Sequence, residues 1–83
     1  MKRLNVAGTD LLLRAGDGPA LVLLHGIGSN GASWSPCMVS LPPGLCALAW
    51  WAPGYGGSRP VAAGRPTPAD YAARLAEVLD ALG

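Results

Sequence analysis

Two unbroken runs of apolar residues dominate the hydrophobic pattern of the chain. Neither run alternates with polar residues, which is typical of strands that are buried on both faces of a parallel sheet. The first run ends in a glycine-rich turn, and the second ends in a loop rich in proline and glycine. We therefore expect two parallel strands, at 20–25 and 45–50, with the first at the centre of the sheet.

The segment between these runs contains a short helix, which we expect from Pro36 to Ser40. Proline is tolerated only in the first turn of a helix, and the sequence Leu-Pro-Pro-Gly at 41–44 prevents the helix from continuing. Parallel strands require a crossover connection of this kind, which is right-handed in almost all proteins. The pattern thus predicts a βαβ unit.

The N-terminal region alternates apolar and polar residues in two short runs, at 2–7 and 9–14, joined at Gly8. This alternation predicts an antiparallel hairpin with one solvated face.

The C-terminal region carries three agreeing helix-start signals. Thr67 is an N-cap residue, Pro68 occupies the first helical position, and Asp70 completes a capping box. Gly83 stands where a C-cap glycine belongs. We expect a helix from about 67 to 82.

This helix has one apolar stripe of residues spaced three or four apart. Its members are Tyr71, Leu75, Val78, Leu79 and Leu82. Asp70 and Arg74 form an acid-before-base pair at i and i+4, which we expect on the other side of the helix.

Length and composition limit the chain to one small domain, 1–83. A chain of 83 residues with 51% hydrophobic and 13% charged residues is too apolar to be disordered, and its apolar runs are shorter than the roughly 18 residues of a membrane span. The net charge of +1 is spread along the chain, so we expect neither nucleic acid nor a membrane as a partner. The N-terminus lacks the apolar region of a secretion signal, which favours a cytoplasmic location.

Cys37 and Cys46 are the only cysteines, and His25 is the only histidine. A metal site would need more ligands, so we expect two buried thiols, no metal and no cofactor.

Glycines at 26, 28 and 31 follow the first apolar run. Glycine lets the backbone adopt positive φ and approach a ligand closely, and outward N–H groups in such a loop can bind an oxyanion or a phosphate.

Several blocks in sequence order resemble the N-terminal part of the α/β-hydrolase superfamily. They are a strand ending in His25-Gly26-Ile-Gly, the tryptophan at 34, the segment Ala-Trp-Trp-Ala-Pro-Gly-Tyr-Gly-Gly-Ser at 49–58, and the capped helix. The blocks are most similar to lactonase- and esterase-like members. The resemblance implies a partial α/β-hydrolase domain that ends before the nucleophile elbow, and a complete enzyme that hydrolyses an ester or lactone.

By position, the resemblance assigns an oxyanion loop to Gly26, Ile27 and Gly28, with the backbone N–H of Ile27 as one donor. It also suggests His25 and Trp34 as pocket residues. His25 is then a structural residue whose imidazole bonds to the backbone, not a general base.

The sequence departs from the family in two respects. Trp51 stands where members usually carry Asp, so the usual polar anchoring of that loop is in question. No Gly-x-Ser-x-Gly occurs, and neither Ser29 nor Ser58 lies in such an elbow. We therefore assign no catalytic residue and expect the chain alone to be inactive toward esters.

Two other functions remain open. Gly26-x-Gly28-x-x-Gly31 matches the dinucleotide fingerprint, but Pro36 interrupts the expected helix, and no acidic residue lies between Asp17 and Asp70 to bind a ribose. A non-catalytic interaction fragment is the third possibility.

The resembled fold pairs the far edge of strand 20–25 with the nucleophile strand. Without that strand, Leu21 to Leu24 form an uncharged, apolar edge. We therefore expect the chain to self-associate or to need the missing C-terminal part as a partner.

Overall fold

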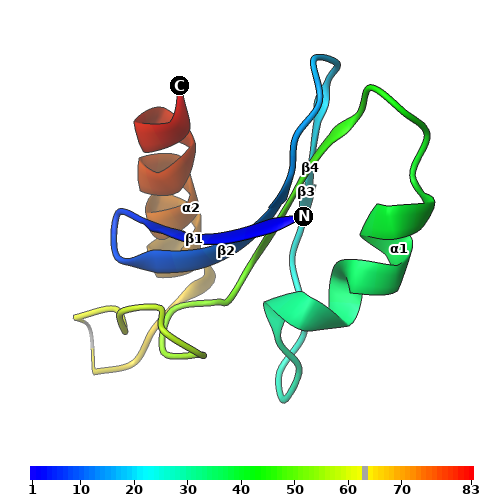
Figure 1. Cartoon of the computed structure of the whole chain (residues 1–83). Coiled ribbons are helices and arrows are strands. Elements are labelled where there is room, and N and C mark those ends of the chain that lie inside the picture. Colours follow the sequence, from blue (N-terminus) through cyan, green and yellow to red (C-terminus); the bar gives the residue numbers. More distant parts are fainter. Residues whose placement is uncertain (63) are drawn as a thin grey trace.

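The computed structural model describes residues 1–62 and 64–83 and forms a mixed sheet flanked by helices (Figure 1). The elements, in chain order, are β1 (Lys2–Val6), β2 (Thr9–Arg14), β3 (Ala20–Leu23), the 3₁₀ helix η1 (Gly31–Trp34), α1 (Ser35–Ser40), β4 (Cys46–Trp50) and α2 (Pro68–Leu82). The strand order is β1-β2-β4-β3, with β3 parallel to β4 and the other neighbours antiparallel. The described residues thus have the α/β architecture that the sequence predicts.

The N-terminal hairpin is confirmed, with a two-residue turn instead of a junction at Gly8 alone. Ala7 and Gly8 have φ of +51° and +72°. Two successive positive φ values are typical of a type I′ turn, whose twist matches that of the flanking strands. The first strand therefore ends at Val6, one residue earlier than predicted.

β3 lies at an edge of the sheet, so the central place that the apolar pattern alone suggested for it is wrong, whereas the edge expected without the nucleophile strand is confirmed among the described residues. β4 pairs with β2 on one side and β3 on the other, whereas β3 pairs only with β4 among the described residues. Leu21 is 39% exposed and Leu24 is 48% exposed, so the run is not buried on both faces. It also leaves the sheet after Leu23 instead of reaching His25.

Successive side chains of β4 point to opposite faces and divide the core in two. Leu48 and Trp50 pack with Val78 of α2, whereas Ala47 and Ala49 pack with Met38 of α1. Figure 1 shows α2 and α1 on opposite sides of the strands. Each helix therefore covers one face of the sheet.

The capping box of α2 is confirmed. The Asp70 N–H donates to Oγ1 of Thr67, and the Thr67 N–H donates to the Asp70 carboxylate across 2.8 Å. Gly83 adopts a φ of +92° as the C-cap.

The predicted pairing of Asp70 with Arg74 is wrong. Arg74 is only 5% exposed, and its guanidinium donates to the carbonyls of Arg59 and Pro60. The Asp70 carboxylate is occupied by the capping box. The expected burial of both thiols is also wrong, since Cys37 is exposed.

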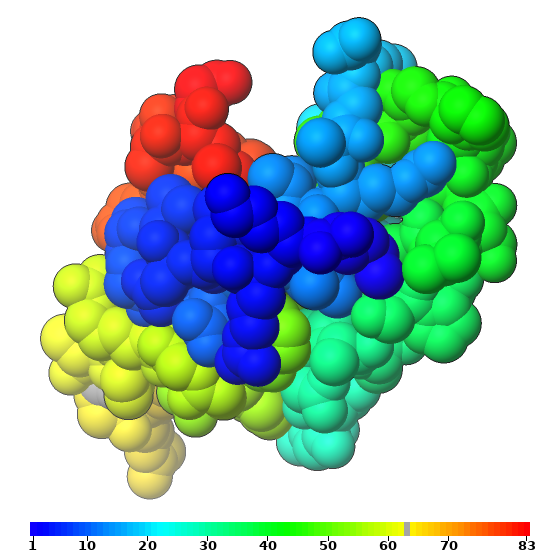
Figure 2. Space-filling view, viewed as in Figure 1, coloured from blue at the N-terminus to red at the C-terminus, as the bar shows by residue number. Residues whose placement is uncertain are grey.

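The loops after β3 and β4 emerge at the same edge of the sheet because the two strands are parallel. In the space-filling view, the turquoise loop after β3 and the yellow-green loop after β4 both lie along the lower side of the molecule (Figure 2). In the described part of the chain, no helix is both long and apolar enough to cross a membrane.

Candidate functional site

The loop after β3 folds into a tight turn at Gly26–Ser29. The Ser29 N–H donates to the Gly26 carbonyl across 3.1 Å, and Gly28 has a φ of +80°. A positive φ at the third position of a four-residue turn is the mark of type II and requires glycine or asparagine there. Ile27 takes the second position, and its N–H has no hydrogen-bond acceptor among the described residues.

His25 anchors this turn to the loop after β4. Its Nε2 lies 3.0 Å from the backbone nitrogen of Ala52, and its Nδ1 lies 2.9 Å from the Gly26 carbonyl oxygen. Because a backbone N–H can only donate and a carbonyl can only accept, the proton is on Nδ1 and Nε2 accepts. Both ring nitrogens are occupied, so His25 has the structural role that the sequence predicts.

Tyr55 supports the same turn from the loop after β4. Its ring meets the His25 ring edge-on, with centroids 4.9 Å apart and an interplanar angle of 68°. Its hydroxyl oxygen accepts from the Gly28 N–H across 3.4 Å. The glycine turn is therefore held by two side chains, His25 from its own strand end and Tyr55 from the neighbouring loop.

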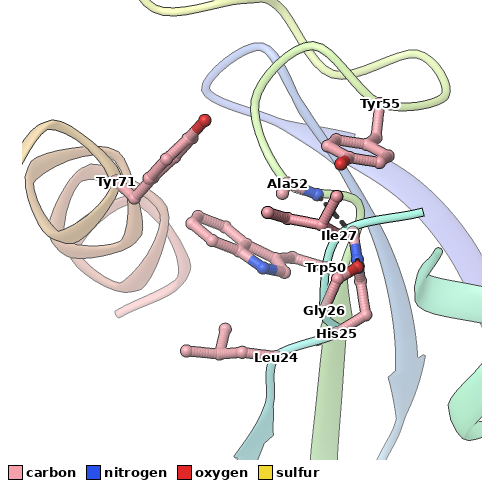
Figure 3. A pocket seen from close by; sticks show the side chains of 8 residues that line it. All are labelled: Leu24, His25, Gly26, Ile27, Trp50, Ala52, Tyr55 and Tyr71. Atoms are coloured by element: carbon pink, nitrogen blue, oxygen red, sulfur yellow. Dashed lines mark hydrogen bonds between the residues drawn. The ribbon is translucent and has the colours of Figure 1, made fainter. Parts of the chain in front are cut away.

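A cavity of about 220 Å³ lies between these loops and α2 (Figure 3). It is lined by Leu24, His25, Gly26, Ile27, Trp50, Ala52, Tyr55 and Tyr71. Ile27 is fully exposed and stands at its rim. The cavity brings together three predicted site residues, His25, Gly26 and Ile27, while Gly28 lies next to them in the turn.

Trp34 lies elsewhere. It packs with Leu23 and Met38 on the α1 face, whereas the cavity lies on the α2 face beside Trp50. Prediction from the sequence therefore placed Trp34 in a pocket that it does not line.

Three aromatic residues of the cavity went unassigned at the sequence level. Tyr71 belongs to the predicted stripe of α2, and Trp50 and Tyr55 belong to the second family-like block. Their positions could have identified them. Trp50 ends β4, Tyr55 lies in the loop that follows it, and Tyr71 lies on the face of α2 that covers β4.

Gly31 is a packing residue. A Cβ there would lie 2.7 Å from Cε3 of Trp51 and 2.8 Å from the Trp50 carbonyl oxygen. Its φ is not positive, and neither is that of Gly26, so of the three glycines only Gly28 needs the left-handed region. The helix that follows is a 3₁₀ turn leading into the six-residue α1, which gives little support to dinucleotide binding.

The loop after β4 has polar anchoring although Trp51 replaces the usual Asp. Asp10 of β2 supplies the carboxylate, which accepts from the Gly57 N–H across 2.8 Å, from Asn5 across 3.0 Å and from Arg3 across 2.9 Å. The guanidinium of Arg3 also lies 4.2 Å above the Trp51 ring, a cation–π contact.

These contacts stabilise the ionised form of Asp10. The hydrogen bond from Asn5 lowers the Asp10 pKa most and that from Arg3 comes next; burial opposes them, and the Gly57 N–H and the charge of Arg3 lower the pKa further. The Asp10 carboxylate is therefore charged at neutral pH, and its hydrogen bond from the Gly57 N–H attaches it to the loop after β4.

The two serines near the site are engaged in structural bonds. Ser58 is 4% exposed; its Oγ donates to the Trp51 carbonyl across 2.5 Å and accepts from the Asp10 N–H. Ser29 donates to Oγ of Ser33 across 3.1 Å. Neither hydroxyl contacts His25 in the described bonds, so neither is activated as a nucleophile.

Comparison with known proteins gives two short matches. A stretch of 41 residues, 49% of the chain, is 51% identical to the pimeloyl-(acyl-carrier protein) methyl ester esterase of Vibrio parahaemolyticus and covers 16% of that enzyme. A stretch of 43 residues, 52% of the chain, is 51% identical to the enzyme of the same name from Vibrio campbellii and covers 17% of it. The matched part of the chain thus spans only about a sixth of the length of these relatives.

No protein-family model matches the chain, and no solved structure gives a significant match. The segment is therefore similar to part of two esterases, and ester hydrolysis is the chemistry of the proteins that it resembles.

Proposed function

We propose that the chain is the N-terminal part of an α/β-hydrolase domain and that it supplies the oxyanion loop of an ester- or lactone-hydrolysing enzyme. The observation that carries the proposal is the Ile27 N–H, which is left without an acceptor in a turn held at the rim of an apolar cavity. A fixed backbone N–H is the donor that stabilises an oxyanion as it develops during acyl transfer.

The similarity to esterases supports this assignment independently of the geometry. The match is strong over its short length, and the expected blocks, a glycine turn after one parallel strand and an anchored loop after the next, lie side by side in the structure. Dinucleotide binding lacks comparable support, since no acidic residue lies between Asp17 and Asp70, the stretch in which the fingerprint places the partner of a ribose.

On this proposal the 83 residues alone are inactive. Acyl transfer requires a nucleophile, a base that activates it and a group that orients the base. The sole histidine has both nitrogens bound to backbone, and the two serines of the site are bound in loops. Purified chain should therefore hydrolyse p-nitrophenyl acetate no faster than buffer.

A chimeric enzyme tests the oxyanion role. The chain replaces the homologous segment of the Vibrio parahaemolyticus esterase, and hydrolysis of p-nitrophenyl acetate is measured. Ile27→Pro removes the N–H but suits the second position of a type II turn, where proline is common. We expect kcat to fall by about 100- to 1,000-fold, the usual cost of losing one oxyanion donor.

Ile27→Ala is the matched control, because it truncates the exposed side chain and keeps the N–H. Equal kcat values for Ile27→Pro and Ile27→Ala would show that this N–H does not contact the reacting carbonyl.

We further propose that the outer edge of β3 pairs with another strand, either from the remainder of the hydrolase or from a second copy of the chain. Among the described residues β3 has one partner strand, and Leu21 and Leu24 are exposed beside it. Such an edge, free of charge and proline, is a template for further pairing.

A further inference from the structure

We propose that the Tyr55 hydroxyl is a second hydrogen-bond donor of the cavity, so that the cavity binds small apolar molecules carrying a carbonyl oxygen. This inference deepens the proposed function, and it rests on that function for the identity of the natural ligand, an ester or lactone.

The hydrogen-bonding of Tyr55 leaves its proton available. A phenolic hydroxyl has one donor and can also accept. The oxygen accepts from the Gly28 N–H across 3.4 Å, and among the described residues the O–H donates to no acceptor. The proton is therefore free for a ligand that enters the cavity.

The position of the hydroxyl brings it beside the Ile27 N–H. It is bonded to the residue that follows Ile27, and Figure 3 shows the hydroxyl end of Tyr55 turned toward Ile27. The ring is held in place by its edge-on contact with His25. Two donors, the backbone N–H of Ile27 and the side-chain O–H of Tyr55, thus lie next to each other in fixed positions.

The other polar side chains of the cavity are bonded already or lie away from Ile27. The indole nitrogen of Trp50 lies on the edge of its ring nearer Leu24 in Figure 3. Both nitrogens of His25 are bound to backbone groups. Tyr71 lines the opposite wall on α2, and its hydroxyl points away from Trp50 in Figure 3. Tyr55 is therefore the side chain that can donate at the end of the cavity where Ile27 lies.

The size and walls of the cavity define the ligand class. Its volume of about 220 Å³ is smaller than the roughly 300–1,000 Å³ of sites for drug-sized ligands. Leu24, Trp50 and Ala52 provide apolar walls. The cavity suits a short acyl or alcohol group, or a small lactone ring, with its carbonyl oxygen directed at Tyr55.

The test uses the 83-residue chain and two probes of nearly the same shape. Cyclopentanone carries one carbonyl acceptor and cyclopentane carries none. Titrations followed by ¹H–¹⁵N NMR at the Ile27 and Gly28 amides give the dissociation constants. We expect wild-type protein to prefer the ketone by about three- to tenfold, the range expected for one neutral hydrogen bond.

Tyr55→Phe should abolish this preference, since it keeps the ring beside His25 and deletes the hydroxyl. Tyr71→Phe is the matched control, which deletes the other hydroxyl of the cavity and should preserve the preference. A ketone preference that survives in Tyr55→Phe would overturn the inference.

A second measurement covers the case in which Tyr55→Phe disturbs the loop. In wild-type protein, bound cyclopentanone should show intermolecular nuclear Overhauser effects to the Tyr55 ring, and their absence would overturn the inference without any variant. An inactive chimera together with an intact ketone preference would contradict the proposed hydrolase function and leave the donor role of Tyr55 standing. If the chimera hydrolyses the ester in a way that depends on the Ile27 N–H, but the 83-residue chain shows no ketone preference, the donor role of Tyr55 is contradicted and the hydrolase function stands.

Discussion

The guanidinium of Arg74 donates to the backbone carbonyl of Arg59 across 2.6 Å. The same group donates to the Pro60 carbonyl across 3.2 Å and to Oγ1 of the buried Thr9 across 3.4 Å. A buried cation thus joins α2, β2 and the end of the loop that carries Tyr55, and carbonyl and hydroxyl oxygens replace water around its charge.

Arg74→Ala should lower the free energy of unfolding by about 2–3 kcal/mol, because it deletes charge-assisted hydrogen bonds to backbone carbonyls. Arg74→Lys should recover only part of the loss, since an ammonium group does not reproduce the planar fork of the guanidinium. Urea denaturation followed by circular dichroism measures both. Arg65→Ala, at an exposed position, is the control and should be nearly neutral; an Arg74→Ala variant as stable as this control would contradict the prediction.

Asp10 should make stability depend on pH at the acidic end. Its pKa is lowered in the folded chain, so its contribution is complete above the ordinary value of 3.8 and disappears as the pH falls through the lowered value. Asp10→Asn should therefore be less stable than wild type at neutral pH, and the difference should shrink below pH 3.8. Thermal melts from pH 7 to pH 2 would reveal this, and a constant difference over that range would refute it.

Gly31→Ala should destabilise the fold by about 1–3 kcal/mol, the usual cost of overpacking a close contact. The new Cβ would clash with the Trp51 ring and with the backbone carbonyl oxygen of Trp50. The carbonyl oxygen cannot move aside, because it belongs to the backbone. Gly64→Ala is the matched control because no atom lies within 4 Å of its Cβ position. Similar urea midpoints for the two variants would show that the contact at Gly31 relaxes at no cost.

The β3 edge should cause the chain to self-associate at concentrations in the range of tens of micromolar, roughly where exposed edges associate. Leu21→Lys should favour the monomer, because a charge on an edge strand opposes further pairing. Leu21 is the position for this change since it is 39% exposed, whereas Leu23 is 9% exposed and packs near Met38. Sedimentation velocity distinguishes the states. Wild-type chain that sediments as a monomer across this range would refute the prediction.

The sequence by itself determined the elements whose causes are local. The start of α2 follows from Thr67, Pro68 and Asp70, because a capping box involves groups only three residues apart. The glycine turn after β3 and the structural role of His25 also followed from the sequence, the latter through the resemblance of the surrounding block to a known family.

The tertiary structure decided everything that depends on which strands are neighbours. An unbroken apolar run predicts a strand but not its place in the sheet, so this pattern alone suggested a central place for β3, although β3 lies at an edge and β4 is interior. The same limit applies to side chains. Arg74 was expected to pair with Asp70, but it bonds instead to the backbone at Arg59. Trp34 was expected in the pocket, but it packs with Leu23 and Met38. Tyr55 acquired its role only when the parallel pairing of β3 with β4 brought its hydroxyl to the Gly28 N–H, because long-range pairing sets contacts that no local pattern encodes.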